Sequence, residues 1–387
     1  MLYSFKKINI ESPFPTTQCG HASQTYLLDT YHDHLYARVT GLKDENNWII
    51  HISFDLLAFD LKHRNDLQNY LKDYYKSDIH LITSTTHTHY ANSVRDDKYV
   101  DYLMKLLKEE IIKMEYIQKD NVSSSYLFMP SKSIGRSRIS NYETDNEYLA
   151  LIRFYENDIN FYNLIYYNCH PTILYANTKY FSSEYPGYIL KRLEEKYPNV
   201  SFSFIQGAAG DISSRFNRSG QDYQALIELG DKLLEDIDKL FNKKADRIPL
   251  ILKYNEKDIE YKHEFTPIDL SNIRDNLSER ELETIKLGQI QREKLEQNKN
   301  KIFSKLIKQA LIASLDIGSV KLIFFPNEIF SEYINYLDIN KELLVSYSNG
   351  YGPYVLPIDF KYITYEMFTD TLSKETKQKI IKIFQSI

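Results

Sequence analysis

Cysteines and long apolar runs are scarce or missing in this 387-residue chain, and each absence excludes a class of protein. Only two cysteines are present, Cys19 and Cys169, and neither belongs to a CxxC pair, so a cysteine-based zinc finger is excluded. No stretch approaches the roughly 20 consecutive apolar residues that a membrane-spanning helix needs. The chain also has no internal repeat and no low-complexity run, which excludes solenoid and repeat architectures.

The net charge indicates which partners the protein can bind, and the N-terminal residues and cysteines indicate its cellular compartment. A formal net charge of -5 and a pI near 6.1 argue against a nucleic-acid partner, because such proteins usually carry a basic face. The opening residues, MLYSFKKINIES, lack the apolar core of a secretion signal. Two isolated thiols fit a reducing compartment. We therefore expect a cytoplasmic protein without a transmembrane segment, whose oligomeric state the sequence leaves open.

Runs rich in β-branched and aromatic residues alternate with amphipathic patterns along the chain. The first kind predicts strands, and the second, with apolar residues three and four apart, predicts helices. Strands are expected at Leu35–Thr40, Trp48–Phe54, Ile79–Ser84, Tyr148–Tyr155, Phe161–Tyr167, Val200–Gln206 and Val320–Phe325. Helices are expected at Leu61–Lys76, Tyr99–Met114, Tyr188–Lys196 and Tyr223–Phe241. This alternation indicates an α/β fold of mixed β-sheets covered by helices.

A long charged stretch interrupts the alternation at about residues 271–316. In its centre, ERELETIKLGQIQREKLEQNKNKIF, Glu and Lys or Arg stand three or four residues apart. This spacing predicts a solvent-exposed helix. Such a helix normally packs one face on the body of the protein, although a lid or a dimer contact is an alternative. Because no Pro-, Gly- or Ser-rich linker is evident, we expect residues 1–387 to form a single domain.

Two histidine segments follow predicted strands. In IHLITSTTHTHY, His87 and His89 alternate along an extended chain, so they are expected to share a face about 7 Å apart. In FYNLIYYNCHPT, His170 precedes a proline, which favours an extended backbone at the histidine. Groups at the carboxyl ends of strands are favoured as catalytic residues. Taken singly, each histidine could equally be an ordinary hydrogen-bonded or turn residue.

Three further segments carry polar or small residues. GAAGDISS, at residues 207–214, contains Asp211 and Ser213 in a turn where the backbone can approach a ligand closely. VKLIFFPNEI places Glu328 at a strand end, as a potential oxygen ligand of a metal. SYSNGYGPYV is a Gly-containing loop with three tyrosines. Two histidines, one carboxylate and an open position form a common plan for catalytic zinc.

In their order, these segments resemble the neutral/alkaline non-lysosomal ceramidase family. The matching motifs are TTHTH at 85–89, GRS at 135–137, CHPT at 169–172, GDISS at 210–214, PNE at 326–328, NGYGPY at 349–354 and YE at 365–366. The resemblance covers about residues 8–366. It implies the fold of the family's catalytic domain in a shortened chain without the family's C-terminal immunoglobulin-like domain.

The resemblance also implies roles for individual residues. It makes His87, His170, Glu328 and Tyr354 the ligands of a Zn²⁺ cofactor. It places His89 beside the metal as general acid or base, Ser213 at the presumed nucleophile position, and Tyr365 and Arg136 at the developing oxyanion. Gly20 lines the pocket mouth, and Asp211 accompanies Ser213 in substrate binding.

The expected activity is zinc-dependent hydrolysis of an amide in a ceramide-like N-acyl substrate, a reaction of sphingolipid metabolism. The sequence departs from the family at two of the motifs. GDISSR lacks the usual Pro-Asn, and Tyr90-Ala91-Asn92 stands after THTH where the family has Ser-Gly-Pro. Two alternatives follow from these departures. One is a zinc hydrolase of another acylated small molecule, an ester or an amide, and the other is a catalytically inert binding protein of the same fold.

Overall fold

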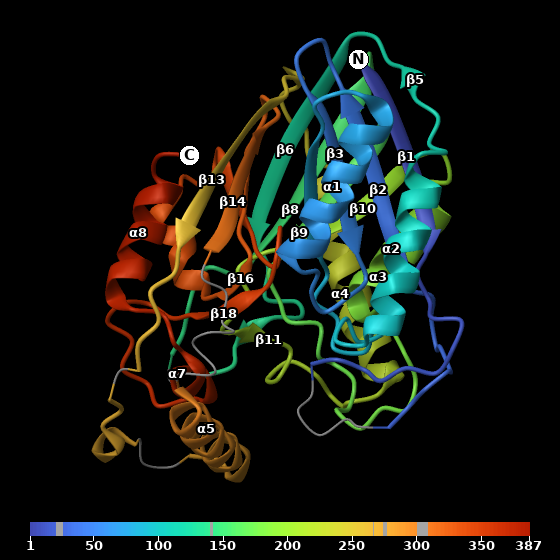
Figure 1. Ribbon diagram of the computed structural model, residues 1–387. Coiled ribbons are helices and arrows are strands. Elements are labelled where there is room, and N and C mark those ends of the chain that lie inside the picture. Colours follow the sequence, from blue (N-terminus) through green and yellow to red (C-terminus); the bar gives the residue numbers. More distant parts are fainter. Residues whose placement is uncertain (21–25, 140–141, 266, 274–276, 300–308) are drawn as a thin grey trace.

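The computed structural model describes residues 1–20, 26–139, 142–265, 267–273, 277–299 and 309–387. Within these residues the strands form three larger sheets and two short two-stranded ladders (Figure 1). Helices lie on the outer faces of the first two sheets, and the third sheet leads to the C-terminus.

The first sheet has the strand order β4-β3-β2-β1-β5. Its strands are β1 (Leu2–Asn9), β2 (Tyr36–Lys43), β3 (Trp48–Phe54), β4 (His80–Thr85) and β5 (Ile117–Gln118). β3 and β4 are parallel, because helix α1 (Leu61–Tyr75) returns the chain between them, and the other pairs are antiparallel. The apolar stripes of α1 and of α2 (Asp97–Ile111) pack on one face of this sheet.

The second sheet repeats this plan, with the order β10-β9-β8-β6-β12. Its strands are β6 (Val122–Pro130), β8 (Tyr148–Glu156), β9 (Ile159–Tyr167), β10 (Ser201–Gln206) and β12 (Ile248–Pro249). Helix α3 (Glu184–Lys196) connects the parallel strands β9 and β10. It packs with α4 (Tyr223–Phe241) on one face of the sheet. Asp222 caps α4 by accepting a hydrogen bond from the Ala225 N–H, which fixes where that helix begins.

The two sheets bury their remaining faces against each other. Ile49 and Ile82 of the first sheet share a core cluster with Ile152 and Ile205 of the second, and β10 lies beside β3 and β4. A strand covered on both faces reads as a nearly continuous apolar run, which is why these strands were recognisable in the sequence. The prediction of an α/β fold of mixed, helix-covered sheets is confirmed.

The C-terminal part adds the third sheet, in the order β13-β14-β15-β17. Its strands are β13 (Lys253–Glu260), β14 (Gln309–Asp316), β15 (Lys321–Phe324) and β17 (Glu342–Val345). The two ladders are β7 (Arg136–Ser137) with β11 (Ile212–Ser213), and β16 (Asn327–Ile329) with β18 (Gly352–Val355). The remaining elements are η1 (Leu270–Asn272), α5 (Glu279–Gln297), η2 (Ser331–Tyr336), α7 (Tyr365–Thr369) and α8 (Lys374–Phe384).

The prediction of one long helix over residues 271–316 is wrong in its second part. Helix α5 begins at a capping box formed by Ser278 and Glu281 and ends at Gln297, whereas residues 309–316 form strand β14. β14 is paired on both sides and almost fully buried, and a short buried apolar run does not distinguish a strand from a helix. Residues 274–276 and 300–308 of that stretch lie outside the described residues. As expected, α5 packs one face on the body, through Ile285 against Phe368.

Among the helices that the structure describes, none combines the length and the apolar character needed to cross a bilayer.

Candidate metal centre

His87 lies just beyond the end of β4 and is almost fully buried. Its backbone is left-handed, with φ 64°, so the extended conformation expected through His89 ends at Thr85. The His87 Nδ1 lies 2.8 Å from the carbonyl oxygen of Leu57 and donates its hydrogen there. Its Nε2 is buried and has no hydrogen-bond partner within the described residues. The ring therefore presents an Nε2 without a hydrogen-bond partner to the interior.

His170 follows β9 and is held in the same manner. Its Nδ1 lies 2.6 Å from the carbonyl oxygen of Ala209, which directs Nε2 toward His87 and Glu328. Burial, reinforced by the positive charge of Arg138, lowers the pKa of His170 to about 4, so its imidazole is neutral at physiological pH. A backbone carbonyl on one ring nitrogen is the usual way in which a protein orients a metal-binding histidine.

Glu328, in β16, supplies the carboxylate between the two rings. Its Oε2 lies 3.2 Å from the His170 Nε2 and 3.6 Å from the His87 Nε2, and its Oε1 accepts a hydrogen bond from Tyr351. Burial raises the pKa of the Glu328 carboxyl, but the two histidines hold that pKa well below its usual range. The group is therefore ionised.

These three groups converge in the interior. Because both Nδ1 atoms are engaged by backbone carbonyls, both Nε2 atoms face the ionised carboxylate of Glu328. Two imidazole nitrogens and a carboxylate oxygen are ligands that can share a cation. The separations of 3.2 and 3.6 Å match the roughly 3.3 Å between neighbouring ligands of a tetrahedral zinc with bonds near 2 Å. The residues present thus fit a bound Zn²⁺.

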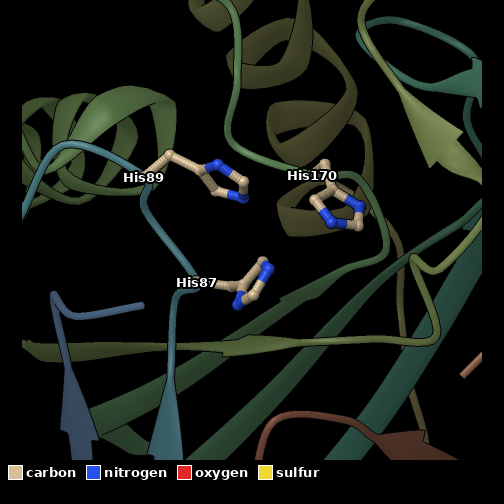
Figure 2. Close-up of side chains that lie close together, drawn as sticks. All are labelled: His87, His89 and His170. Atoms are coloured by element: carbon tan, nitrogen blue, oxygen red, sulfur yellow. The ribbon is translucent and has the colours of Figure 1, made fainter. Parts of the chain in front are cut away.

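His89 lies beside this set, and Figure 2 shows the rings of His87, His89 and His170 facing a common space. Ligand atoms of the three histidines all lie within 4.8 Å of one another. The His87 and His89 ring centroids are 5.1 Å apart, less than the 7 Å expected for an extended strand, because the left-handed residue turns the chain. A second ligand set, with His89 replacing Glu328, is therefore geometrically open.

Gly20 packs against His89. A Cβ at this position would lie 2.6 Å from the His89 Nδ1, and the φ of 117° also favours glycine. The structure thus places Gly20 beside the histidine cluster, where a larger side chain would displace the ring of His89.

Two tyrosines that the sequence did not single out contact the cluster. Tyr351 donates its hydroxyl hydrogen to Glu328, and the ring of Tyr347 stacks on that of His87. The predicted ligand Tyr354 lies opposite Glu328 in the β16–β18 ladder, and its hydroxyl accepts a hydrogen bond from Arg138 at 3.2 Å. The three tyrosines in one loop were the only indication, and the sequence offered no means of ranking them.

Arg138 was also missed, because the motif pointed to Arg136 two residues earlier. The Arg138 Nη2 lies 2.8 Å from a carboxylate oxygen of Glu366 and donates to the carbonyl of Gly210. Glu366 directly follows Tyr365, the first residue of α7, so this ion pair anchors the start of α7, where Tyr365 lies. Burial raises the pKa of Tyr365, with a smaller contribution from Glu328.

Ser213 lies between two other predicted residues. It bridges to His170 on one side and pairs with Arg136 on the other, so the three backbones are neighbours. Its side chain is nearly buried, and its Oγ accepts a hydrogen bond of 3.4 Å from the Arg215 N–H. Asp211 is fully buried, and its two oxygens accept hydrogen bonds from the N–H and the hydroxyl of Ser331.

A pocket adjoins the exposed Arg136. Among the described residues it is lined by Lys132, Arg136, Ser137, Ile139, Tyr142, Glu143, Thr144, Glu147 and Phe216. Five of these side chains are ionisable, and burial raises the pKa of Glu147 to about 7. The space beside Arg136 is thus predominantly polar.

Comparisons with known proteins place this geometry in a known fold. No protein-family model and no curated protein match the sequence. Among solved structures, neutral ceramidase from Pseudomonas aeruginosa matches with a TM-score of 0.72 and 13% identity, over 99% of this chain and 73% of that one. A ceramidase complexed with C2 matches with the same score and identity, over 99% and 74%. The chain therefore has the neutral ceramidase fold over nearly its whole length, as the order of its motifs predicted.

Proposed function

We propose that the protein is a zinc-dependent hydrolase that cleaves the amide bond of an N-acyl compound, with His87, His170 and Glu328 holding the metal. The observation that carries this proposal is the convergence of two buried imidazole Nε2 atoms on one carboxylate oxygen, at 3.2 and 3.6 Å. The neutral ceramidase fold and the ordered motifs support the choice of reaction.

The bound zinc would polarise the acyl carbonyl and lower the pKa of water. The residues of this chain supply orientation and proton transfer. The carbonyls of Leu57 and Ala209 keep both Nε2 atoms directed at the metal. In the ligand set implied by the resemblance, Tyr354 is the fourth member, oriented by the guanidinium of Arg138.

His89 is the proposed general acid or base, since it is partly accessible and adjoins the metal cluster. Ser213 either attacks the carbonyl carbon or positions the attacking water. Tyr365 and Arg136 would donate hydrogen bonds to the developing oxyanion, and donors of this kind contribute about 3–4 kcal/mol each.

A second candidate substrate is a smaller, polar acyl compound rather than ceramide. It is favoured by the pocket next to Arg136, the proposed oxyanion residue, because Lys132, Glu143 and Glu147 also line that pocket. A long lipid chain gains nothing from such a lining, because the hydrophobic effect requires apolar contact surface.

Metal analysis tests the central assignment. Purified protein is expected to contain about one zinc per chain, and His170→Ala to contain almost none while remaining folded by circular dichroism. A variant of the solvent-exposed His34, which lies outside the cluster, serves as the control and keeps its zinc. Wild-type protein without stoichiometric metal after zinc reconstitution would refute the proposal.

Activity is tested on paired N-acyl substrates, with a short-chain ceramide against N-acetylated amines of similar size that carry a charged group. Cleavage of either class supports the amidase, and the preferred class decides between the two candidates. Ser213→Ala separates the mechanisms, since loss of less than about tenfold in kcat removes Ser213 as the nucleophile. The exposed Ser219→Ala is the matched control.

A further inference from the structure

Tyr347 is a buried residue at the metal centre to which neither the motifs nor the proposed reaction gives a role. Its ring lies on that of His87, with centroids 3.9 Å apart and planes inclined by 22°. It also meets His170 edge-on at 6.1 Å. The side chain is 1% exposed. His87 is thus held from two directions, by the Leu57 carbonyl at Nδ1 and by this ring on its face.

The two stacked residues share an unusual backbone conformation. His87 has φ 64° and Tyr347 has φ 53°, a left-handed region that bulky side chains rarely adopt. Neighbouring hydrogen bonds hold them there, including the Thr85 N–H to the Tyr347 carbonyl at 3.1 Å. Conformations of this kind persist where the surrounding structure enforces them, and they are concentrated at functional sites.

The hydroxyl of Tyr347 has no hydrogen-bond partner within the described residues, although it is buried. A buried polar group without a partner destabilises a protein, so such groups call for a functional explanation. Burial raises the pKa of this hydroxyl well above its ordinary value, with smaller contributions from Glu328 and Tyr354. The unpaired hydroxyl thus belongs to a ring that stacks on the proposed metal ligand His87.

We propose that Tyr347 is a further residue of this site with two separable roles. Its ring is a positioning element that fixes the plane of His87, and its hydroxyl is a hydrogen-bond donor for an oxygen of the occupant of the site, a water or an acyl oxygen. The second role rests on the proposed function, whereas the first requires only that His87 binds a metal.

Two substitutions separate these roles. Tyr347→Phe keeps the stacked ring and removes the hydroxyl, and Tyr347→Leu removes both. Three quantities are measured for each variant: the melting temperature of the metal-free protein, the Zn²⁺ affinity by chelator competition, and the affinity of the zinc-loaded protein for acetohydroxamic acid. Tyr162→Phe, which removes an equally buried phenol oxygen at the far end of β9, is the matched control.

For Tyr347→Phe we expect a melting temperature higher by about 1–3 °C, a zinc affinity within twofold of wild type, and hydroxamate binding about tenfold weaker. For Tyr347→Leu the zinc affinity falls at least about tenfold, as expected when the support of a ligand is lost. Tyr162→Phe changes neither affinity by more than twofold.

A lower melting temperature for Tyr347→Phe would mean that the hydroxyl has a structural partner, and unchanged hydroxamate binding would mean that it donates to no ligand. Either result overturns the donor role. Unchanged zinc affinity in Tyr347→Leu overturns the positioning role. Failure of the wild type to bind zinc instead refutes the proposed function, and the melting temperature of the metal-free protein still reports whether the hydroxyl is unpaired.

Discussion

The inner and outer halves of the site are held in place by different kinds of contact. The inner half consists of His87, His170 and Glu328, and its two imidazoles are oriented by backbone carbonyls next to strand ends. The outer half consists of Tyr354 and Tyr365, which depend on the ion pair of Arg138 with Glu366.

The difference has a physical consequence. A backbone carbonyl is positioned by the strands next to it, so no single side chain outside the inner half provides the hydrogen bonds to the two Nδ1 atoms. The outer half depends on a single ion pair between two distant segments. Removal of one partner should displace both tyrosines, because the remaining charge stays buried without compensation. Three predictions test this contrast.

The largest effect is expected from the ligands themselves. His87→Ala and His170→Ala should each weaken zinc binding by more than about 1000-fold, because each removes a directly coordinating nitrogen. Glu328→Ala and His89→Ala then distinguish the two geometrically open ligand sets, and only the true third ligand should give a loss of similar size. Chelator competition measures these affinities. Equal, small losses for all four variants would contradict a metal centre built on the histidines.

The ion pair of the outer half should give the next largest effect. Arg138→Met and Glu366→Gln are each expected to lower the free energy of unfolding by about 3 kcal/mol, since each leaves one buried charge unpaired. Urea denaturation measures this, and the double variant should lose clearly less than the sum of the two.

The control for that experiment is the Arg38–Asp55 pair, which is also buried, at 3.1 Å, but lies in the first sheet. Arg38→Met should destabilise to a similar extent and leave zinc and substrate affinity unchanged. Arg138→Met should lower turnover as well. If Arg38→Met and Arg138→Met behaved identically in every assay, the Arg138–Glu366 ion pair would have no role in the site beyond stability.

The smallest effect concerns Glu184, which anchors the loop after His170. Its carboxylate accepts hydrogen bonds from the N–H groups of Ile173, Leu174 and Tyr185. Burial raises its pKa from 4.5 to about 7. Because the folded protein then holds a proton that the unfolded chain releases, the stability due to this group is full below pH 4.5 and is lost as the pH rises through 7.

Between pH 5 and pH 7.5 this loss amounts to about 2 kcal/mol. Glu184→Gln should remove that part of the slope, and urea denaturation of both proteins at the two pH values measures the difference. Parallel pH profiles would show that Glu184 does not carry the raised pKa. Other buried carboxyls, such as Asp211 with a pKa of about 6, contribute equally to both proteins and cancel in the comparison.

The fold was largely predictable because most strands and helices are specified by the pattern of residues within each element. The apolar runs of β3, β9 and β10 and the amphipathic pattern of α4 depend on the spacing of residues within one element, and the structure has them at or near the expected bounds. The strand β14 was mistaken for helix because only its pairing on both sides distinguishes the two. The neutral ceramidase fold followed from the chain order of several motifs, although no single motif specified it.

For the site, the sequence by itself determined that His87, His170 and Glu328 each follow a recognisable apolar run, whereas the structure places Glu328 within the short strand β16. Only the tertiary structure decided that Leu57 and Ala209 orient the rings, that Tyr351 and Tyr347 contact the cluster, and that Arg138 pairs with Glu366. Those contacts join segments far apart in the chain. Spacing along a sequence specifies neighbours within an element, whereas partners across elements depend on how the sheets and loops pack.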